Sequence, residues 1–363
     1  MSAAEDVQFL ALLVHRGHLS RSQAETIVPR LRSGEALDGV LEGLSGWDAR
    51  KVAKLRRTRA GEIPEIPGYE VLGRLGTGGT ADVFRVRELA TGRGLALKVL
   101  RPDVAMKRSE LEAFVREAKT LQRLSHPGLV AGHGAAKSGD TYFARLELVD
   151  GRTLLEVLDE GHGLEEEGAL RIILEVAEVL AYLASEGLVH RDVKPGNIML
   201  GNNGQVKLID LGFCAAQDAV DAADTARGTV QYLSPEQAEG GACADVRSDV
   251  YSLGVTLFQL LVGRLPFEGD CNDDTLRMHV MERLSSPELK SRGLSPHVQY
   301  FIEKMMAKEA ELRYQNFEEL IEDIRGQVEG RASLDFRADT TGRTRHKVGR
   351  PAPPRGARRP PRP

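Results

Sequence analysis

The sequence predicts an α+β protein with two lobes, in which a small strand-rich lobe precedes a larger helical lobe. Strand-like stretches flank a glycine-rich turn after residue 69. From residue 151 to residue 324 the pattern is mostly helical. A short helical segment precedes the lobes, and a tail rich in Arg and Pro follows them. We therefore divide the chain into a helical module with its linker (1–66), the two-lobed domain (67–326) and a disordered tail (327–363).

The composition is that of a globular protein with room for one large or two medium domains, since 41% of its 363 residues are hydrophobic and 28% are charged. The three cysteines have neither metal-site spacing nor a disulfide framework. Glu5 and Asp6 precede the apolar run 9–14, where a secretory signal carries basic residues. The apolar stretch 169–184 contains charged residues and reads as an amphipathic helix. We expect a cytoplasmic protein without a membrane anchor.

The first 66 residues form the predicted helical module. Phe9 and Leu13 belong to an apolar helical pattern, and Ser20 with Gln23 is typical of a capping box that begins a second helix. Prolines in 63–68 disfavour helix and mark a linker. The pattern leaves two roles open for this module, a docking or oligomerisation element for a protein partner and a structural brace.

The strand-rich lobe begins after the linker. Residues 69–72 and 83–86 read as strands on either side of the glycine-rich turn, and 95–100 is a third strand. Residues 108–124 form a charged amphipathic helix, and 142–148 return to strand character.

The turn has the pattern Gly-x-Gly-x-x-Ala, from Gly76 to Ala81. This pattern also fits a dinucleotide site, but there a helix follows the turn, whereas here a strand follows. Glycines let backbone N–H groups approach phosphates without a side chain in the way. The turn is therefore a candidate phosphate-binding loop.

Four polar side chains lie within one loop-strand-loop segment further along the chain. They are two carboxylates, an ammonium and an amide: Asp192, Asp210, Lys194 and Asn197. Phosphoryl transfer from a nucleotide needs a carboxylate to orient the hydroxyl nucleophile, a cation near the moving phosphoryl group, and oxygen ligands for magnesium. This segment is the strongest functional signal in the sequence.

From residue 69 to residue 324 the chain resembles bacterial eukaryotic-like (Hanks-type) serine/threonine protein kinases. The motifs that carry the resemblance are His190-Arg191-Asp192, Asp210-Leu211-Gly212, Leu95-Ala96-Leu97-Lys98 and Ser234-Pro235-Glu236. The resemblance implies the two-lobed protein kinase fold for residues 67–326, with ATP as phosphoryl donor and Mg²⁺ as metal.

The resemblance also implies catalytic roles. Asp192 orients the substrate hydroxyl and accepts its proton, and Lys194 contacts the γ-phosphate. Lys98, in an ion pair with Glu117, positions the α- and β-phosphates. The implied metal ligands are Asn197 and Asp210. The implied nucleotide-binding residues are Leu75, Gly76, Gly78, Gly79, Val83, Ala96, Lys98, Glu147, Val149 and Met199.

Two positions depart from the pattern of the family. Ala81 stands where the third glycine of the loop is usual. Gly132 stands where the regulatory spine usually has a larger apolar residue, which puts the rigidity of the active state in doubt.

In the large lobe, residues 228–237 resemble the end of an activation segment. There Glu236 is expected to pair with Arg313, and Asp249 to brace the catalytic loop. Thr229 resembles the threonine that hydrogen-bonds Asp192 and Lys194.

The resemblance further implies regulation by activation-loop autophosphorylation. Arg191, directly before Asp192, marks kinases in which a basic pocket receives an activation-loop phosphate. Because the hydroxyl of Thr229 is expected to be occupied, Thr225 is the predicted phosphosite. The alternative is that aspartates already supply the negative charge. They are Asp218, Asp221 and Asp224.

The function implied is transfer of the γ-phosphoryl group of Mg-ATP to Ser/Thr hydroxyls of proteins. The alternative is a pseudokinase scaffold that binds nucleotide or partners without catalysis, although the residues that scaffolds lose are all present. A small-molecule kinase is disfavoured by Lys194 and the Ser-Pro-Glu segment.

The tail differs in charge from the rest of the chain. Residues 331–363 carry ten Lys and Arg against two Asp, while the whole chain has a net charge of −4, so the remainder sums to about −12. A basic, proline-rich composition favours disorder. Binding of a partner or of nucleic acid is the second reading, and nucleic acid is unlikely because no aromatic residue separates the final arginines.

Overall fold

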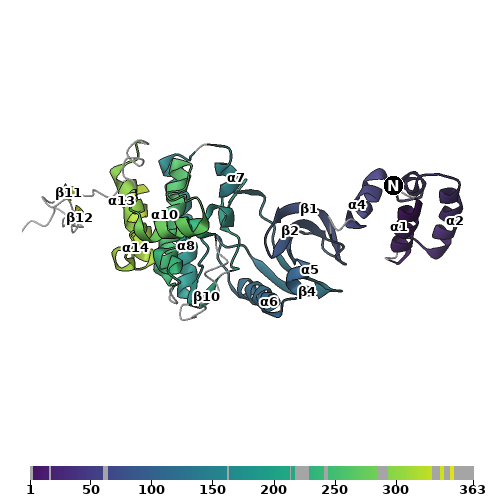
Figure 1. Ribbon diagram of the computed structural model, residues 1–363, viewed down its shortest axis with the longest axis horizontal. Coiled ribbons are helices and arrows are strands. Elements are labelled where there is room, and N and C mark those ends of the chain that lie inside the picture. Colours follow the sequence, from purple (N-terminus) through teal and green to yellow (C-terminus); the bar gives the residue numbers. More distant parts are fainter. Residues whose placement is uncertain are drawn as a thin grey trace, which may run out of the picture. The chain divides into compact units, whose positions relative to one another are not determined.

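The structure is a computed structural model. It describes residues 3–15, 18–59, 64–161, 163–212, 214–216, 229–240, 244–284, 293–328, 336–338 and 344–346. The chain divides into two compact units, called unit 1 and unit 2 below (Figure 1). Unit 1 comprises Met1–Leu124 and Ala131–Leu148, and unit 2 comprises Ser125–Val130 and Val149–Pro363.

Unit 1 begins with a module of four helices, which are α1 (Ala3–His15), α2 (Arg21–Arg32), α3 (Leu37–Glu42) and α4 (Ala49–Arg59). The predicted capping box is confirmed, because Ser20 Oγ accepts a hydrogen bond from Gln23 N and the Gln23 side chain accepts one from Ser20 N. The apolar faces of these helices pack into a core of their own, with Phe9, Leu13 and Leu41 almost fully buried. The module therefore has an apolar core that contains no residue of the sheet that follows.

A five-stranded antiparallel sheet follows, in the order β1-β2-β3-β5-β4. Its strands are β1 (Tyr69–Thr77), β2 (Ala81–Glu88), β3 (Gly94–Leu100), β4 (Gly132–Ser138) and β5 (Thr141–Glu147). Two helices, α5 (Pro102–Ala105) and α6 (Arg108–Arg123), connect β3 to β4. The core on one face of the sheet includes Phe84, Leu97 and Phe143, and it already takes in Ile66 from the end of the linker.

The alternation of side chains along β3 places Lys98. Leu97 and Val99 belong to the core on one face, so Ala96 and Lys98 point to the other. On that second face α6 packs through Phe114 and Ala118 against Leu100 and other apolar residues of the sheet. The same alternation that buries the core therefore directs the Lys98 ammonium to the side of the sheet that α6 covers.

Unit 2 is mostly helical. Its helices are α7 (Leu154–Leu158), α8 (Glu166–Ser185), α9 (Pro235–Ala238), α10 (Val246–Val262), α11 (Asn272–Met281), α13 (Pro296–Met305) and α14 (Phe317–Val328). Helix α10 is buried along almost its whole length, from Ser248 to Val262, and α8 and α13 pack against it (Figure 1). Its buried polar side chains, which include Asp249 and Ser252, are hydrogen-bonded to neighbouring groups.

Short strands complete unit 2. They are β6 (Gly151–Thr153), β7 (Leu188–Val189), β8 (Ile198–Gly201), β9 (Val206–Leu208) and β10 (Ala215–Ala216). Strands β6, β8 and β9 form one small sheet, and β7 pairs with β10. Within the tail, β11 (Phe336–Ala338) pairs with β12 (Thr344–His346).

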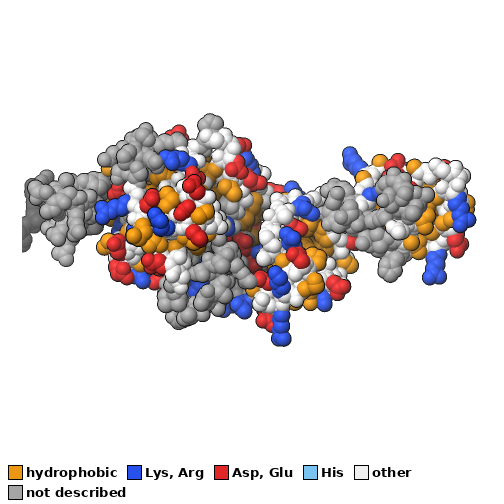
Figure 2. Space-filling view, in the orientation of Figure 1, with side chains coloured by type: hydrophobic (Ala, Val, Ile, Leu, Met, Phe, Trp, Pro, Cys, Tyr) orange, Lys and Arg blue, Asp and Glu red, His pale blue; other side chains and the backbone are white. Residues whose placement is uncertain are grey.

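The surface of the described residues mixes side chains of all kinds. Acidic and basic side chains are intermingled with hydrophobic ones on the visible face of each unit (Figure 2). Among the helices that the structure describes, none has both the length and the apolar character needed to cross a membrane.

Candidate active site

Unit 1 holds the predicted ion pair. Lys98 Nζ, on β3, donates to Glu117 Oε1, on α6, at 2.7 Å, and the two side chains are only 15% and 9% exposed. A charge-assisted hydrogen bond in such a sheltered place fixes the position of the ammonium. The pairing predicted from the sequence is confirmed.

The glycine-rich turn joins β1 to β2. Gly78 N donates to Ala81 O at 2.9 Å, and a Cβ on Gly78 would lie 3.0 Å from the same oxygen, whereas Gly76 and Gly79 face open space. Ala81 is 4% exposed, because it begins β2 and pairs with Leu100 of β3. The departure from glycine at Ala81 thus places a methyl group inside the lobe.

The second departure from the family pattern, Gly132 in place of a larger apolar residue, also has a packing reason. A Cβ on Gly132 would lie 2.7 Å from both the carbonyl carbon and the Cβ of Leu121, on α6. Real Cβ atoms do not come this close, so the backbone of α6 can approach β4 only because residue 132 has no side chain. Gly132 therefore allows a closer approach of α6 to the sheet than a larger residue would.

The nucleotide-binding residues expected in unit 1 lie on the sheet. Val83 pairs with Lys98, Ala96 pairs with Leu146, and Leu75 is half exposed on β1. Glu147, at the end of β5, exchanges hydrogen bonds with Ala131: its N–H donates to the Ala131 carbonyl at 2.8 Å, and its carboxylate accepts from Ala131 N at 3.0 Å.

The other two nucleotide-binding residues belong to unit 2, where both are partly buried. Val149 lies in the segment before β6, and Met199 is on β8, paired with Thr153 and Lys207. The part of these residues in nucleotide binding stays a prediction.

In unit 2 the catalytic loop brings together the polar side chains that the sequence predicted. Asp192 is 7% exposed, and its carboxylate accepts hydrogen bonds from Lys194 Nζ, at 2.7 and 2.9 Å, and from Asn197 Nδ2, at 2.8 Å. Lys194 Nζ also donates to Thr229 Oγ1 at 2.6 Å, as expected for that threonine. The carboxylate is thus held in one orientation by two donors from its own loop.

The two expected metal ligands are joined through the backbone. Ile209 N donates to Asn197 O at 3.0 Å, and Asp210 follows directly, with its carboxylate accepting from Gly212 N at 3.0 Å. Asn197 Nδ2 donates hydrogen bonds to the backbone carbonyl and to the carboxylate of Asp192. The acceptor atom of the same amide is Asn197 Oδ1. Amide and carboxylate oxygens are ligands that Mg²⁺ prefers, so the donor set fits this ion. Within the described ranges no group of three or more His, Cys, Asp and Glu has the arrangement of a metal site.

Arg191 has a backbone conformation that L-residues rarely adopt, with φ of +67°. The Asp249 carboxylate, on α10, accepts hydrogen bonds from His190 N and Arg191 N, both at 2.7 Å. Burial raises the pKa of the Asp249 carboxyl, while His190, Arg191 and these backbone donors oppose the rise. The predicted bracing of the catalytic loop by Asp249 is confirmed.

The end of the activation segment is anchored by a second buried pair. Arg313 has a fully buried side chain and binds the Glu236 carboxylate through two hydrogen bonds of 2.8 Å, as the sequence predicted. Burial alone would raise the pKa of Glu236, but its bonds to Arg313 and to Ser248 Oγ lower it to about 2. Glu236 therefore remains ionised at any physiological pH.

Two contacts of the site were not predicted from the sequence, and four residues of the predicted activation segment lie outside the described residues. Sequence reasoning missed Ser248 as a partner of Glu236 and the Tyr232 hydroxyl donating to Gln259 Oε1 at 2.6 Å. No local pattern signals such contacts, because their partners lie 12 and 27 residues away. Thr225 lies outside the described residues, as do the three aspartates proposed as its alternative: Asp218, Asp221 and Asp224.

Comparison with known proteins identifies the family. The protein kinase domain family matches residues 69–323. A probable serine/threonine-protein kinase of Streptomyces coelicolor is 37% identical over 273 residues, which cover 72% of this chain and 40% of that protein. PknB of Mycobacterium leprae is 37% identical over 263 residues, covering 70% and 42%. PrkC of Bacillus subtilis is 34% identical over 259 residues, covering 71% and 40%.

The chain spans about two fifths of the length of these curated relatives, and the family match covers the region that contains the motifs. The family match includes both the Lys98–Glu117 pair and the catalytic loop around Asp192. The chain therefore belongs to the protein kinase family, among the bacterial Hanks-type serine/threonine protein kinases.

Proposed function

We propose that this chain is an active serine/threonine protein kinase that transfers the γ-phosphoryl group of Mg-ATP to Ser/Thr hydroxyls of proteins. The observation that carries the proposal is the environment of Asp192. Its carboxylate is sheltered and is held by Lys194 and Asn197, so it is oriented before any substrate binds. Preorganised polar groups of this kind stabilise a transition state without having to reorganise during the reaction.

In this proposal each side chain does one part of the chemistry. The Asp192 carboxylate orients the incoming hydroxyl and accepts its proton as the oxygen attacks phosphorus. Lys194, already bound to Asp192 and Thr229, supplies positive charge near the transferred phosphoryl group. Lys98, held by Glu117, binds the phosphates that remain with the nucleotide.

ATP and Mg²⁺ complete the proposed site. Asn197 and Asp210 would hold the metal, which when bound neutralises phosphate charge. The backbone N–H groups of the glycine-rich turn, Gly76 to Gly79, would contact the phosphates, because glycines leave that backbone open. Val83, Ala96 and Met199 would supply apolar contacts to the base.

The test is a phosphotransfer assay with labelled ATP and Mg²⁺ on a generic basic protein and on the chain itself. Asp192→Asn and Lys98→Met should each lower the rate by at least about a hundredfold, with little change in melting temperature. Asp140→Asn and Lys119→Met, which replace exposed residues of the same types, serve as controls. Wild-type protein that binds nucleotide but transfers no phosphate would establish the pseudokinase alternative.

We further propose regulation by phosphorylation of Thr225. The bond between Thr229 Oγ1 and Lys194 supports this choice, because it occupies one of the few hydroxyls in the segment. A phosphate carries about −1.5 to −2 charges and three acceptor oxygens, against one charge for an aspartate. Mass spectrometry of active protein, with Thr225→Ala kinetics, decides the matter: an unmodified Thr225 with undiminished activity in the variant would favour the aspartates.

The cell compartment and the partners are also proposals. We place the chain in the cytoplasm, where ATP is available, and the three widely spaced cysteines, which form no disulfide framework in the sequence, are typical of a reducing compartment. Proteins with accessible Ser or Thr are the proposed substrates. The helical module, which has its own core, is the proposed site for a protein partner.

A further inference from the structure

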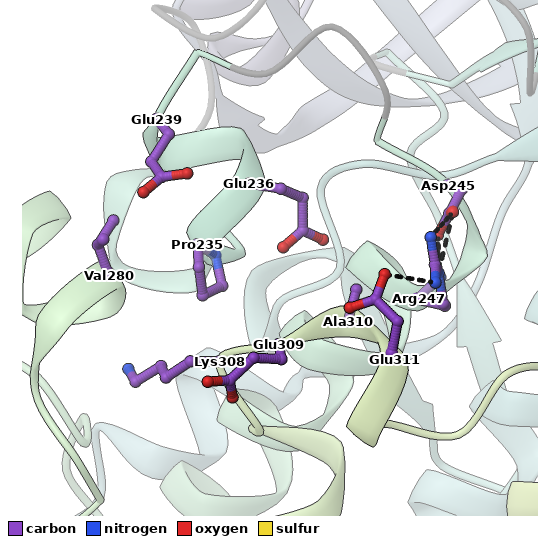
Figure 3. Close-up of a pocket in the computed structure, with 10 residues that line it drawn as sticks. All are labelled: Pro235, Glu236, Glu239, Asp245, Arg247, Val280, Lys308, Glu309, Ala310 and Glu311. Atoms are coloured by element: carbon purple, nitrogen blue, oxygen red, sulfur yellow. Dashed lines mark hydrogen bonds and ion pairs between the residues drawn. The ribbon is translucent and has the colours of Figure 1, made fainter.

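Unit 2 contains a pocket of about 390 Å³ beside the anchored end of the activation segment. Its lining comes from α9, from the start of α10, from the end of α11 and from the loop that precedes Arg313 (Figure 3). Five of the ten lining residues are carboxylates, and two are cations. The carboxylates are Glu236, Glu239, Asp245, Glu309 and Glu311. The charge of the lining therefore favours a cationic ligand.

Three of these carboxylates already have cationic partners in unit 2. Glu236 binds the buried Arg313 at 2.8 Å. Asp245 and Glu311 both bind Arg247, at 2.8 Å and 3.5 Å. These three carboxylates therefore hold the walls of the pocket together.

The other two carboxylates, Glu239 and Glu309, are exposed and have no hydrogen bond or ion pair with any side chain that the structure describes. In Figure 3, Glu239 lies on α9 and Glu309 on the loop after Lys308, with Pro235 drawn between them. A guanidinium group presents a planar fork of N–H donors that matches a carboxylate. Glu239 and Glu309 are therefore suited to bind arginine.

Lys308 is directed to another group. Its Nζ donates hydrogen bonds to His279 O at 2.6 Å and to Met278 O at 3.3 Å. These carbonyls belong to the last turn of α11, where backbone acceptors lack partners within the helix, so the ammonium caps the end of α11. Its side chain accordingly runs toward the helix that carries Val280 (Figure 3).

The pocket also has an apolar part, which Pro235, Val280 and Ala310 form. Two large apolar side chains that adjoin the lining residues in sequence are exposed, Met281 to 73% and Leu312 to 63%. Apolar surface beside a few well-placed polar groups is typical of binding pockets. The pocket therefore suits a segment that carries both cationic and apolar side chains.

Residues 347–363, called the basic segment below, have this composition. They contain six Lys and Arg, six Pro and no Asp or Glu. Residues 331–363 as a whole carry about +8 and the rest of the chain about −12, so the two parts attract each other. Prolines restrict the backbone, and binding such a segment therefore costs less conformational entropy.

The basic segment can reach the pocket from the end of α14. Gln315, just before α14, donates to Ala310 O at 3.1 Å, so this helix begins beside the pocket. Its 12 residues span about 18 Å, and residues 329–335 can span about 23 Å in return. The hairpin of β11 and β12 brings Phe336 next to His346, so it adds little to the path.

We propose that this pocket binds the basic segment of the same chain, with arginines on Glu239 and Glu309 and prolines on the apolar part. Exposed ion pairs are weak singly. A short tether, however, gives the segment an effective concentration of about millimolar, so a weak site is occupied for much of the time. The bound segment lies beside the Glu236–Arg313 pair that anchors the activation segment.

The first experiment maps the position of the basic segment in the full chain. Arg355→Lys keeps the charge and supplies an amine that a carbodiimide joins directly to a carboxylate in contact with it. Mass spectrometry should find links from position 355 to Glu239 and Glu309. These should exceed links to Glu186 and Glu322, which are exposed acids of the same unit, at least about fivefold.

Two outcomes of the cross-linking overturn the proposal. One is an even spread of links over the exposed acids. The other is a mixture of isotope-labelled and unlabelled chains in which most links join one chain to another, because the proposed contact lies within a single chain.

The second experiment measures how far the pocket protects the basic segment from trypsin, which cleaves after Arg355 and Arg358 because no proline follows them. The double variant Glu239→Gln, Glu309→Gln should be cleaved there at least about threefold faster than the wild type at low salt, since two exposed ion pairs are lost. Its fold should be unchanged, because neither carboxylate has a described side-chain partner. NaCl at about 0.5 M, which shortens the Debye length to about 4 Å, should remove the difference in cleavage rate.

The double variant Glu186→Gln, Glu322→Gln is the matched control, because it makes the same change of charge elsewhere in unit 2. Its cleavage rate should equal that of the wild type. Equal rates in all three proteins, or an equal increase in the control, overturn the proposal. Neither experiment requires phosphate transfer, so their results are independent of the proposed kinase function.

Discussion

At the scale of single residues, the catalytic loop depends on one carboxylate from a distant helix. Arg191 holds a φ of +67°, a conformation that costs free energy for any residue other than glycine. Asp249 offsets this cost, because its carboxylate accepts hydrogen bonds from the backbone N–H groups of both His190 and Arg191. The position of Asp192, the next residue, follows from this constraint.

Asp249→Asn tests that dependence. An amide keeps one acceptor oxygen, so one of the two backbone N–H groups would face an NH₂ group in a buried place, at a cost of about 1–3 kcal/mol. We expect kcat to fall at least about tenfold, because small displacements of a catalytic group are costly, with a lower melting temperature. Unchanged kcat in a folded variant would show that the loop holds its conformation without Asp249.

Glu236→Gln tests the buried pair with Arg313. The pKa of Glu236 lies below its ordinary value of 4.5, at about 2, so its contribution to stability is present above pH 4.5 and is lost as the pH falls toward 2. At pH 7 the variant should lose about 2–4 kcal/mol of unfolding free energy.

Urea unfolding at several pH values provides the measurement for this variant. The difference in unfolding free energy between wild type and Glu236→Gln should become smaller as the pH is lowered from about 5 to about 2. If this difference in unfolding free energy stays constant over the range, the negative charge of Glu236 does not stabilise the protein through Arg313.

At the scale of elements, α6 and β4 are in unusually close contact. Strand β4 was not predicted from the sequence, because its segment 132–138 contains glycine and alanine in place of the β-branched residues typical of strands. It forms a strand because it pairs with β5 and because α6 packs over Gly132. Helix α6 carries Glu117, so this contact also positions the partner of Lys98.

Gly132→Ala should therefore disturb the ion pair. The added methyl would meet the backbone of Leu121 at 2.7 Å, so α6 must shift, at a cost of about 1–3 kcal/mol. We expect a lower melting temperature and a several-fold higher KM for ATP. Gly73→Ala, in β1, faces open space and is the matched control. Equal effects of the two substitutions would contradict this account of the α6–β4 contact.

At the scale of the whole molecule, the N-terminal module has its own apolar core. Arg56 strengthens it by binding Asp6 at 2.7 Å and by lying 4.7 Å from the centre of the Phe9 ring. A bond of 2.9 Å between His18 Nε2 and Glu65 Oε1 links the module to the segment before β1. That contact is partly exposed, and such pairs contribute little to stability.

A chain that begins at Glu62 should therefore still fold and still phosphorylate a generic basic protein. It keeps Ile66, which belongs to the core of the sheet, and every residue of the proposed site. Its melting temperature and its rate with labelled ATP, compared with those of the full chain, provide the measurement. Loss of soluble folding would show that the module is part of the kinase domain.

The sequence by itself determined the family, the order of the lobes and the side chains that would carry the chemistry, because these are written in short motifs. It also predicted the Lys98–Glu117 and Glu236–Arg313 pairs, but only through the resemblance to known kinases. Only the tertiary structure decided the strand β4, the contact of α6 with Gly132 and the capping of α11 by Lys308. The physical reason is separation along the chain: Lys308 and His279 are 29 residues apart, and local patterns report only a residue's neighbours in sequence.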